Sequence, residues 1–396
     1  MVVDLAVAGW MVVLLAAAVL LTHASATNPF ISNVDFDWVK EVKEFDERKT
    51  GVKGLVDAGV KEIPRLFVHP QEVIDRYPTA KGAAVELPVI DLIGVESGGA
   101  RQREVVEAIG KAAREWGFFS IINHGIPLET MKAMLESIKR FHELPDEEKE
   151  SLYTYERSKL VKWNSNLPAQ KGDPAFGMDV LNVVYTNDHL DPNEIPSACR
   201  KETDEYVKYM IEVRELMAEL FSEALGLPSD YLSKMECMKS QSISCLYYPA
   251  CPEPHKTLGA PKHSDTTFLT LLIQDTLGGL QMLRDKQWVD IPPVPRALIA
   301  NFGDLMQILS NDEFISVEHR VLSQLAGPRI SVATFSTPST RAAGKPFGPI
   351  KELITNEKPA VYRDFMFEEY FQYYKTKGAR VESAFEDFIG SSCMIM

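Results

Sequence analysis

The sequence is poor in the features that mark several large classes of protein. Its five cysteines are scattered and include no Cys-x-x-Cys pair, so a disulfide framework is excluded and reduced thiols are expected. It contains no Asn-x-Ser/Thr glycosylation acceptor, no internal repeat and no low-complexity tract. Lys and Arg number 42 against 56 Asp and Glu, which gives a net charge of −14. With no basic patch, we expect no nucleic-acid partner.

Long apolar runs are also scarce, and the one exception lies at residues 5–21, which carry no charge. This run is long for the core of a signal peptide and short for a membrane span. Residues 24–26 imitate a cleavage site, but Asp4 is the only charged residue before the run. Basic residues such as Lys40 and Lys43 follow it, so an inserted segment would leave the rest of the chain in the cytosol. A cytosol-facing anchor, an extension without function and a secretion signal all stay open; we expect a cytoplasmic protein, with or without this tether.

The remaining composition is that of a globular protein. The chain has 396 residues, 45% hydrophobic and 25% charged, which is enough for one large domain or two. In its first half the pattern predicts mainly helices, with two strands among them. Helical patterns cover residues 35–75 (with turns), 101–116, 128–142, 145–149 and 203–225, and strand patterns cover 87–92 and 117–122. Residues 158–196 show no clear periodicity, which is typical of a functional loop.

The second half of the chain changes to strands and turns. Six strands are predicted, at residues 243–248, 263–274, 279–291, 297–302, 314–322 and 329–337. Such a block favours a closed or two-sheet β architecture, so we predict a mainly β fold with flanking helices: a double-stranded β-helix (a cupin-like jelly roll) with an N-terminal helical region. An aromatic helix at 367–374 is expected to cover a sheet edge or the mouth of a site. The predicted regions are 1–30 (hydrophobic segment), 31–235 (N-terminal region), 236–345 (jelly-roll core) and 346–396 (C-terminal helical region).

One segment of this block carries a candidate metal site. On a strand His263 and Asp265 would project from the same face, and an imidazole with a carboxylate makes two thirds of the facial triad of non-haem Fe(II) oxygenases. His319, on a later predicted strand, is the candidate third ligand. A second His-x-Asp pair begins at His189, but its turn-rich surroundings offer no strand geometry. We assign His124, beside a glycine in a turn, a structural role bonded to the backbone.

A second group of side chains suits a carboxylate. Arg329 and Ser331 share one face of the last predicted strand, and a guanidinium fork with a neighbouring hydroxyl can hold a carboxylate bidentately. Together with the triad, this pair predicts a site for iron and a small diacid.

These motifs resemble those of the plant 2-oxoglutarate- and Fe(II)-dependent dioxygenases, and the resemblance runs from about residue 45 to 378. It rests on the segments at 87–92, 116–119, 123–126, 247–252, 263–265, 316–321 and 329–331. Residues 45–57 and 64–67 resemble the branch of ACC-oxidase homologues, which includes deacetoxyvindoline 4-hydroxylase and the benzoxazinoid-glucoside dioxygenases. Leu246 stands where relatives often carry Asn or His, and 158–196 lacks a Trp-Arg-Asp run, so no relative's substrate is transferred.

The resemblance implies a role for each candidate residue. It implies that iron is bound by His263, Asp265 and His319, and that the distal carboxylate of 2-oxoglutarate is held by Arg329 and Ser331 with help from the Tyr248 hydroxyl. Phe335 falls where relatives place an aromatic ring against the substrate, although a core role is an equal alternative.

The implied activity is hydroxylation of a small plant specialised metabolite, such as a benzoxazinoid glucoside, an alkaloid or a phenolic. The cofactors would be Fe(II), 2-oxoglutarate and ascorbate, with O2 as cosubstrate and with 2-oxoglutarate converted to succinate and CO2. Desaturation, ring closure or demethylation would need only a different placement of the reacting C–H bond. Three alternatives stay open: an ascorbate-driven ACC oxidase, a non-catalytic binding jelly roll and a membrane-tethered peptide hydroxylase. We expect a monomer.

Overall fold

The structure is a computed structural model that describes residues 37–80, 86–165, 167, 172–377 and 386–390. The chain divides into two units, Met1–Phe36 and Asp37–Met396, and the described residues all belong to the second. The apolar segment 5–21 therefore lies outside them. Within the described ranges, no helix is both long and apolar enough to cross a membrane.

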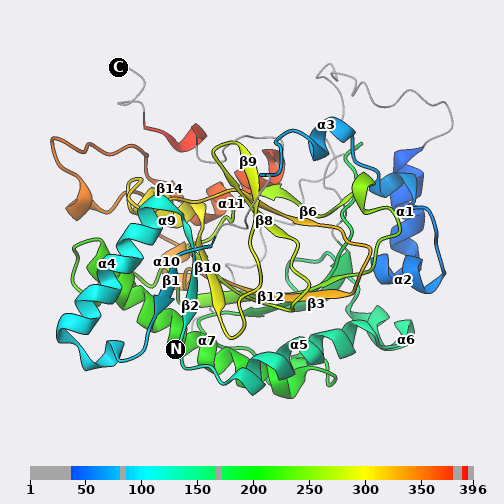
Figure 1. Cartoon of the computed structure of the whole chain (residues 1–396), viewed down its shortest axis with the longest axis horizontal. Coiled ribbons are helices and arrows are strands. Elements are labelled where there is room, and N and C mark those ends of the chain that lie inside the picture. The colour runs from blue at the N-terminus through cyan, green and yellow to red at the C-terminus, as the bar shows by residue number, and fades with distance from the viewer. Residues whose placement is uncertain (1–36, 81–85, 166, 168–171, 378–385, 391–396) are drawn as a thin grey trace, which may run out of the picture. The chain divides into compact units, whose positions relative to one another are not determined.

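Two β-sheets form the centre of the molecule (Figure 1). The large sheet has the order β1-β2-β10-β7-β12-β5-β4-β3, with bounds β1 Val89–Asp91, β2 Phe118–Ile122, β10 Leu298–Phe302, β7 Leu269–Gln274, β12 Arg329–Thr337, β5 Ser240–Tyr248, β4 Asp179–Tyr185 and β3 Val161–Ser165. The small sheet has the order β6-β11-β8-β9, with bounds β6 Leu258–His263, β11 His319–Leu322, β8 Leu280–Arg284 and β9 Gln287–Asp290. Neighbouring strands are antiparallel except β1 and β2, which are parallel. A separate pair joins β13 Pro346–Phe347 to β14 Phe365–Met366.

The inner faces of the two sheets pack against each other. Phe118 and Ile299 of the large sheet share one buried apolar cluster with Leu280, Met282 and Val321 of the small sheet. This arrangement is the predicted double-stranded β-helix, and it leaves the inner face of the large sheet directed toward the small one.

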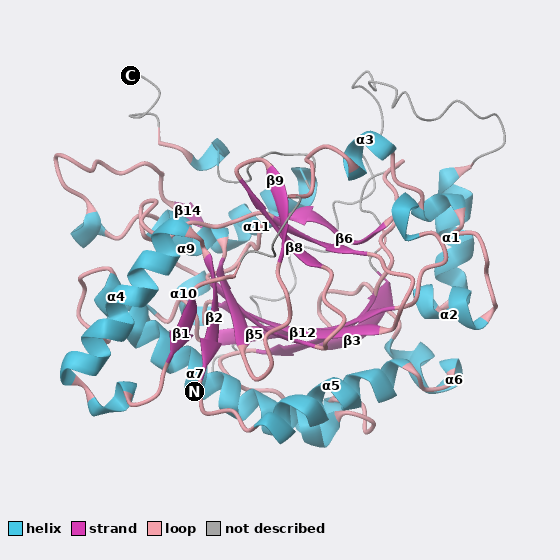
Figure 2. Cartoon of the chain, viewed as in Figure 1, coloured by secondary structure: helices cyan, strands magenta, loops and turns pink. Residues whose placement is uncertain are grey.

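Helices cover the outer face of the large sheet (Figure 2). The three longest helices there are α4 (Gly99–Glu115), α5 (Leu128–His142) and α7 (Arg200–Ala224). Their apolar stripes and alternate residues of the strands, such as Val332 and Cys245, make up the main buried core. The other helices are α1 (Trp38–Arg48), α2 (Gly51–Asp57), α3 (Gln71–Ile74), α6 (Asp146–Lys149), α8 (Tyr231–Met235), α9 (Asp304–Leu309), α10 (Thr340–Ala343) and α11 (Phe367–Lys377).

A buried carboxylate fixes the N-terminal helices to the edge of the large sheet. Asp179 of β4 is completely buried and accepts hydrogen bonds from the backbone N–H groups of Val52 (2.8 Å) and Lys53 (2.9 Å) in the first turn of α2. It also accepts one from the Ser165 hydroxyl at 2.6 Å. The carboxylate thus satisfies N–H groups that have no partner within the helix.

The sequence placed most elements correctly but misjudged four segments. The predicted strand 263–274 is two strands in different sheets, because the chain leaves β6 of the small sheet at His263 and enters the large sheet, as β7, only at Leu269. The predicted strand 314–322 is shorter, since only His319–Leu322 forms β11. The predicted strand 279–291 is the β8–β9 hairpin, turned by Asp285 and Lys286 with φ of 50° and 58°. Residues 158–196, expected as a loop, include β3 and β4, although residues 166 and 168–171 lie outside the described residues.

Candidate metal centre

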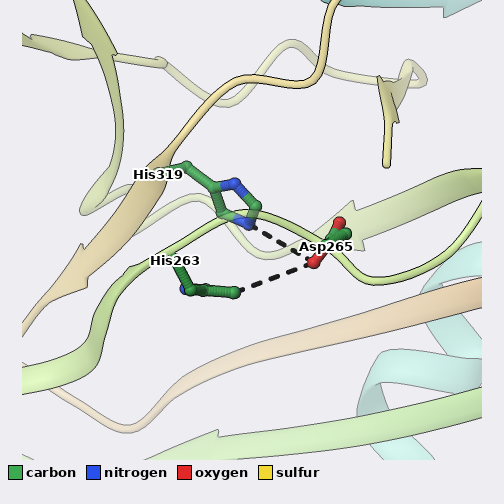
Figure 3. Close-up of side chains that lie close together, drawn as sticks. All are labelled: His263, Asp265 and His319. Carbon is green, nitrogen blue, oxygen red and sulfur yellow. Dashed lines mark ion pairs between the residues drawn. The ribbon is translucent and has the colours of Figure 1, made fainter. Parts of the chain in front are cut away.

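Three side chains come together at the small sheet, where β6 ends and β11 begins. His263 ends β6, His319 begins β11, and the two are register partners across the antiparallel pair. Asp265 lies in the loop after β6, with its Oδ1 3.7 Å from Nε2 of His263 and 3.8 Å from Nε2 of His319 (Figure 3). The three ligand atoms lie within 4.8 Å of one another. The three predicted residues therefore come together. The prediction that His263 and Asp265 lie on one strand is wrong, because β6 ends at His263 and Asp265 lies in the loop that follows it.

Backbone carbonyls orient both imidazoles for metal binding. Nδ1 of His263 lies 2.8 Å from the Pro261 carbonyl oxygen, and Nδ1 of His319 lies 3.2 Å from that of Val317. Each Nδ1–H can donate to its carbonyl, which leaves an unprotonated Nε2 facing the centre. Burial, reinforced by the neighbouring His263, lowers the pKa of His319 to about 4, so this ring is neutral at pH 7.

The carboxylate of Asp265 is held by two strands of the large sheet. Its Oδ2 accepts hydrogen bonds from the Thr270 hydroxyl of β7 (2.5 Å) and from the Asn301 amide of β10 (2.7 Å). Oδ1 is left facing the imidazoles. Burial raises the pKa of Asp265, but the two histidines and these hydrogen bonds outweigh it, so the pKa lies below its usual value. The residue is an ionised carboxylate in a fixed orientation, as a metal ligand would need to be.

A second buried carboxylate ties the surrounding segments together. Asp304 of α9 accepts hydrogen bonds from Ser264 (2.9 Å), Ser316 (2.7 Å) and Tyr370 (2.6 Å). Ser264 stands between two candidate ligands, and its carbonyl also accepts from the Tyr374 hydroxyl at 3.3 Å. The C-terminal aromatic helix α11 is thus packed against the loop that carries Asp265.

The donor set fits ferrous iron. Two imidazole nitrogens and one carboxylate oxygen on one side of a common centre form the 2-His-1-carboxylate pattern. In the part of the chain that the structure describes, this is the only cluster of His, Cys, Asp or Glu arranged to hold a metal. His189 takes part in a turn, paired with Thr186. His124 bonds to backbone as expected: Nε2 lies 3.0 Å from the Arg296 carbonyl and Nδ1 accepts from the Ile126 N–H.

Arg329, the first residue of β12, is a buried cation whose hydrogen bonds go only to neutral groups. It is 2% exposed and donates to Gly278 O (2.6 Å), Gln274 Oε1 (2.7 Å) and Ser331 Oγ (2.9 Å). Its guanidinium carbon lies 5.0 Å from the ring centre of Tyr248. Burial raises the pKa of that tyrosine, and Arg329 and Ser331 partly oppose the shift. A buried guanidinium without a carboxylate partner is a place for an anion.

Phe335 lies on the same face of β12 as Arg329 and Ser331. It is half-buried, and its register partner on β7 is Thr270, which holds Asp265. The intervening residues Ile330 and Val332 belong to the core under the helices. The predicted residues therefore share the inner face of the large sheet.

Sequence reasoning missed the residues that orient the predicted ones. Thr270 and Asn301 hold Asp265, and Gln274 holds Arg329. Each is a polar residue at an inward position of an otherwise apolar strand. That pattern was visible, but only the pairing of distant strands shows which ligand each one contacts.

The fold and the site together define a non-haem iron oxygenase built on a jelly roll. Residues 239–338 match the family model of the 2OG-Fe(II) oxygenase superfamily, and residues 87–198 match that of the non-haem dioxygenase in morphine synthesis N-terminal region. The chain is 44% identical over 337 residues to 1-aminocyclopropane-1-carboxylate oxidase homolog 1 of Arabidopsis thaliana, covering 85% of this chain and 92% of the relative. It is 41% identical over 338 residues to deacetoxyvindoline 4-hydroxylase of Catharanthus roseus, covering 84% of each chain.

Solved structures agree with this assignment. The crystal structure of JOX2 in complex with 2OG, Fe, and JA superposes with a TM-score of 0.76 at 29% identity, covering 86% of this chain and 97% of that one. The dioxygenase for auxin oxidation from rice shares the fold, with a TM-score of 0.62 at 23% identity, covering 77% of this chain and 100% of that one. The chain belongs to the 2OG-Fe(II) oxygenase superfamily. It is a 2-oxoglutarate-dependent dioxygenase, with Fe(II) and 2-oxoglutarate as cofactors and with the ascorbate requirement typical of this family.

Proposed function

We propose that His263, Asp265 and His319 bind Fe(II), and that Arg329, Ser331 and Tyr248 bind the distal carboxylate of 2-oxoglutarate. The enzyme then hydroxylates a small, partly apolar plant metabolite. The observation that carries the proposal is the pairing of a facial triad with a buried, carboxylate-free guanidinium on one inner face.

The chain's own residues account for positioning. Bound iron and 2-oxoglutarate would supply the oxidising chemistry, in which one oxygen atom of O2 enters succinate and the other the substrate. Arg329 sets the orientation of 2-oxoglutarate by a charge-assisted, forked contact. Asn301 and Thr270 prevent Asp265 from turning away from the centre, and Phe335 offers an apolar surface beside it.

The alternatives differ in their use of the Arg329 pocket. An ascorbate-driven ACC oxidase would form ethylene without 2-oxoglutarate, and a binding protein would hold metal without turnover. A binding protein gives no reason for burying a cation beside Ser331, at a cost in desolvation that a carboxylate would offset; an ACC oxidase, whose substrate and ascorbate are themselves anions, is distinguished by the ethylene assay. We therefore favour the 2-oxoglutarate-dependent hydroxylase.

The test is succinate formation by the purified full chain with Fe(II), ascorbate and 2-oxoglutarate. Plant phenolics, alkaloids, benzoxazinoid glucosides and small carboxylic acids would be screened, with mass detection of products that gain one oxygen. Substrate-stimulated succinate supports the proposal. Bound iron without succinate under any condition would favour the binding protein, and ethylene without 2-oxoglutarate would favour the ACC oxidase.

We also propose that the enzyme is a cytoplasmic monomer. The described cysteines, Cys199, Cys237, Cys245 and Cys251, are free thiols, as expected in a reducing compartment. Cell fractionation and light scattering of the purified chain test the two statements separately.

A further inference from the structure

We propose that Lys162, with Asn182 beside it, binds a carboxylate on the substrate, so that the enzyme acts on small acids with an apolar body. The inference rests on the proposed function, because it concerns the same inner face. It concerns the end of the large sheet away from the iron.

Strand register places a polar row across that end. Lys162 of β3 is paired with Asn182 of β4, Asn182 with Ser244 of β5, and Ser244 with Ala333 of β12. Side chains at directly paired positions of antiparallel strands stand on the same face about 5 Å apart. The row therefore runs from the sheet edge to the middle of β12.

This row lies on the inner face. On each of these strands the residue adjacent to the row is buried in the core under the helices, namely Trp163, Leu181, Cys245 and Val332. Since successive side chains on a strand point to opposite faces, the row shares its face with Ser331 and Phe335. Its end at Ala333 lies between Ser331 and Phe335 on β12, whereas its end at Lys162 lies at the sheet edge, away from the iron.

The charge of this row is not neutralised. Lys162 is half-buried and forms no ion pair within 4 Å with another described residue; its Nζ donates only to the Glu156 carbonyl oxygen, at 3.4 Å. Burial and the neighbouring Arg157 lower its pKa, as expected for an ammonium group that lacks an anionic partner. Arg157, the neighbouring cation, forms an ion pair at 3.9 Å with Glu368, an exposed acid. The charge of Lys162 therefore has no described acid within 4 Å to neutralise it.

Asn182 adds a directed donor. Its Oδ1 accepts the Ser244 hydroxyl at 2.8 Å, which leaves the amide N–H groups available for a ligand. An ammonium and an amide N–H on paired strands can each donate to one carboxylate.

Apolar residues occupy the neighbouring positions of the same face. Leu246 of β5 is paired with Ser331, while Ser242 lies between Val184 of β4 and Phe335 of β12. A ligand held at Lys162 and reaching toward the iron would therefore follow the polar row, with these apolar side chains on either side of it. This combination predicts an acid with a hydrocarbon or aromatic body rather than a sugar.

The test compares acids with their methyl esters on the full chain loaded with Fe(II) and 2-oxoglutarate without O2. The probes are trans-cinnamic, phenylacetic, indole-3-acetic and cyclohexylacetic acids, and phenyl glucoside, with binding measured by calorimetry. We expect at least one acid to bind about tenfold or more tightly than its ester, as for a charge-assisted hydrogen bond. Lys162→Met should abolish that preference, Lys162→Arg should partly restore it, and the exposed Lys159→Met is the matched control.

Two results would overturn the inference. One is equal binding of acids and esters, or no binding of any acid; the other is an acid preference that survives Lys162→Met. Tighter binding of the glucoside than of every acid would point instead to a sugar. Iron-dependent succinate formation, measured in the same preparations with and without the panel of substrates, separates the two proposals: succinate formed while acid binding fails refutes only the acid site, and bound iron without succinate under any condition refutes the dioxygenase function itself.

Discussion

Removing the Arg329 guanidinium should weaken 2-oxoglutarate binding while leaving the ligand-free protein folded. Arg329 is 2% exposed, donates to Gly278, Gln274 and Ser331, and forms no ion pair within 4 Å with a described residue, so a carboxylate bound there would be its direct anionic partner. A hydrogen bond to a charged group contributes about 1.5–3 kcal/mol. In Arg329→Met the dissociation constant for 2-oxoglutarate should therefore rise about 10- to 150-fold.

The assay is the unfolding free energy with and without 2-oxoglutarate. A ligand at 100 times its dissociation constant stabilises the native state by about 2.7 kcal/mol. If binding weakens about 100-fold, the same concentration adds only about 0.4 kcal/mol. Arg329→Lys keeps the charge but loses the fork, so its increment should fall in between.

A purely structural Arg329 gives a different pattern. Its loss leaves the Gly278 and Gln274 oxygens without a donor in either case and lowers the stability of the ligand-free protein, but with a purely structural Arg329 the increment added by 2-oxoglutarate would not change. That result would refute the assignment of Arg329 to the carboxylate.

Three further substitutions test the metal ligands, the contact between α2 and β4, and the buried His142. His319→Ala should abolish iron binding and turnover, whereas His189→Ala, which alters the second His-x-Asp pair, should keep both. Full activity of His319→Ala would refute the assignment of the three metal ligands. Asp179→Ala leaves buried donors such as the Ser165 hydroxyl without a partner and should cost about 2–4 kcal/mol in urea unfolding; a loss below about 0.5 kcal/mol would show that the contact between α2 and β4 is dispensable. Burial lowers the pKa of His142 from 6.5 to about 3. As the pH falls below 6.5, the unfolded chain therefore binds a proton at this residue before the folded chain does. The free energy of unfolding should decrease between pH 6.5 and about 3, by up to about 1.4 kcal/mol per pH unit. His142→Phe, which can still stack on Tyr247, should flatten that slope relative to the wild type, and an unchanged slope would contradict it.

The candidate site could be predicted largely because its chemistry needs rare residue types on strand-forming segments. His263, Asp265 and His319 are identifiable from their identities and their strand-forming surroundings, which set aside the second His-x-Asp pair at His189, and Arg329 with Ser331 from one period-2 spacing. The strand β12 and the helix α5 were found with the bounds that the structure gives, 329–337 and 128–142, since each has a regular pattern and a clear end.

What the sequence could not give depends on contacts between distant strands. Nothing local distinguishes Thr266 to Phe268 from a continued strand, because β-branched and aromatic residues also occur in turns that tertiary contacts stabilise. The pairings of Asp265 with Thr270 and Asn301, and of Lys162 with Asn182, follow from sheet order, which no single segment encodes. Residues 158–196 seemed irregular because the edge strand β3 and its neighbour β4 are short and neither alternates polar and apolar residues throughout.

The most direct measurement is an anaerobic titration of the full chain, first with Fe(II) and then with 2-oxoglutarate, followed by iron analysis and visible absorption. We expect the chain to bind one Fe(II) and to develop a new charge-transfer band that appears only when 2-oxoglutarate is added. The band should be lost in His319→Ala and shifted to higher 2-oxoglutarate concentration in Arg329→Met. If the chain binds no iron, or if its visible spectrum does not change when 2-oxoglutarate is added, the proposed iron and 2-oxoglutarate site is wrong.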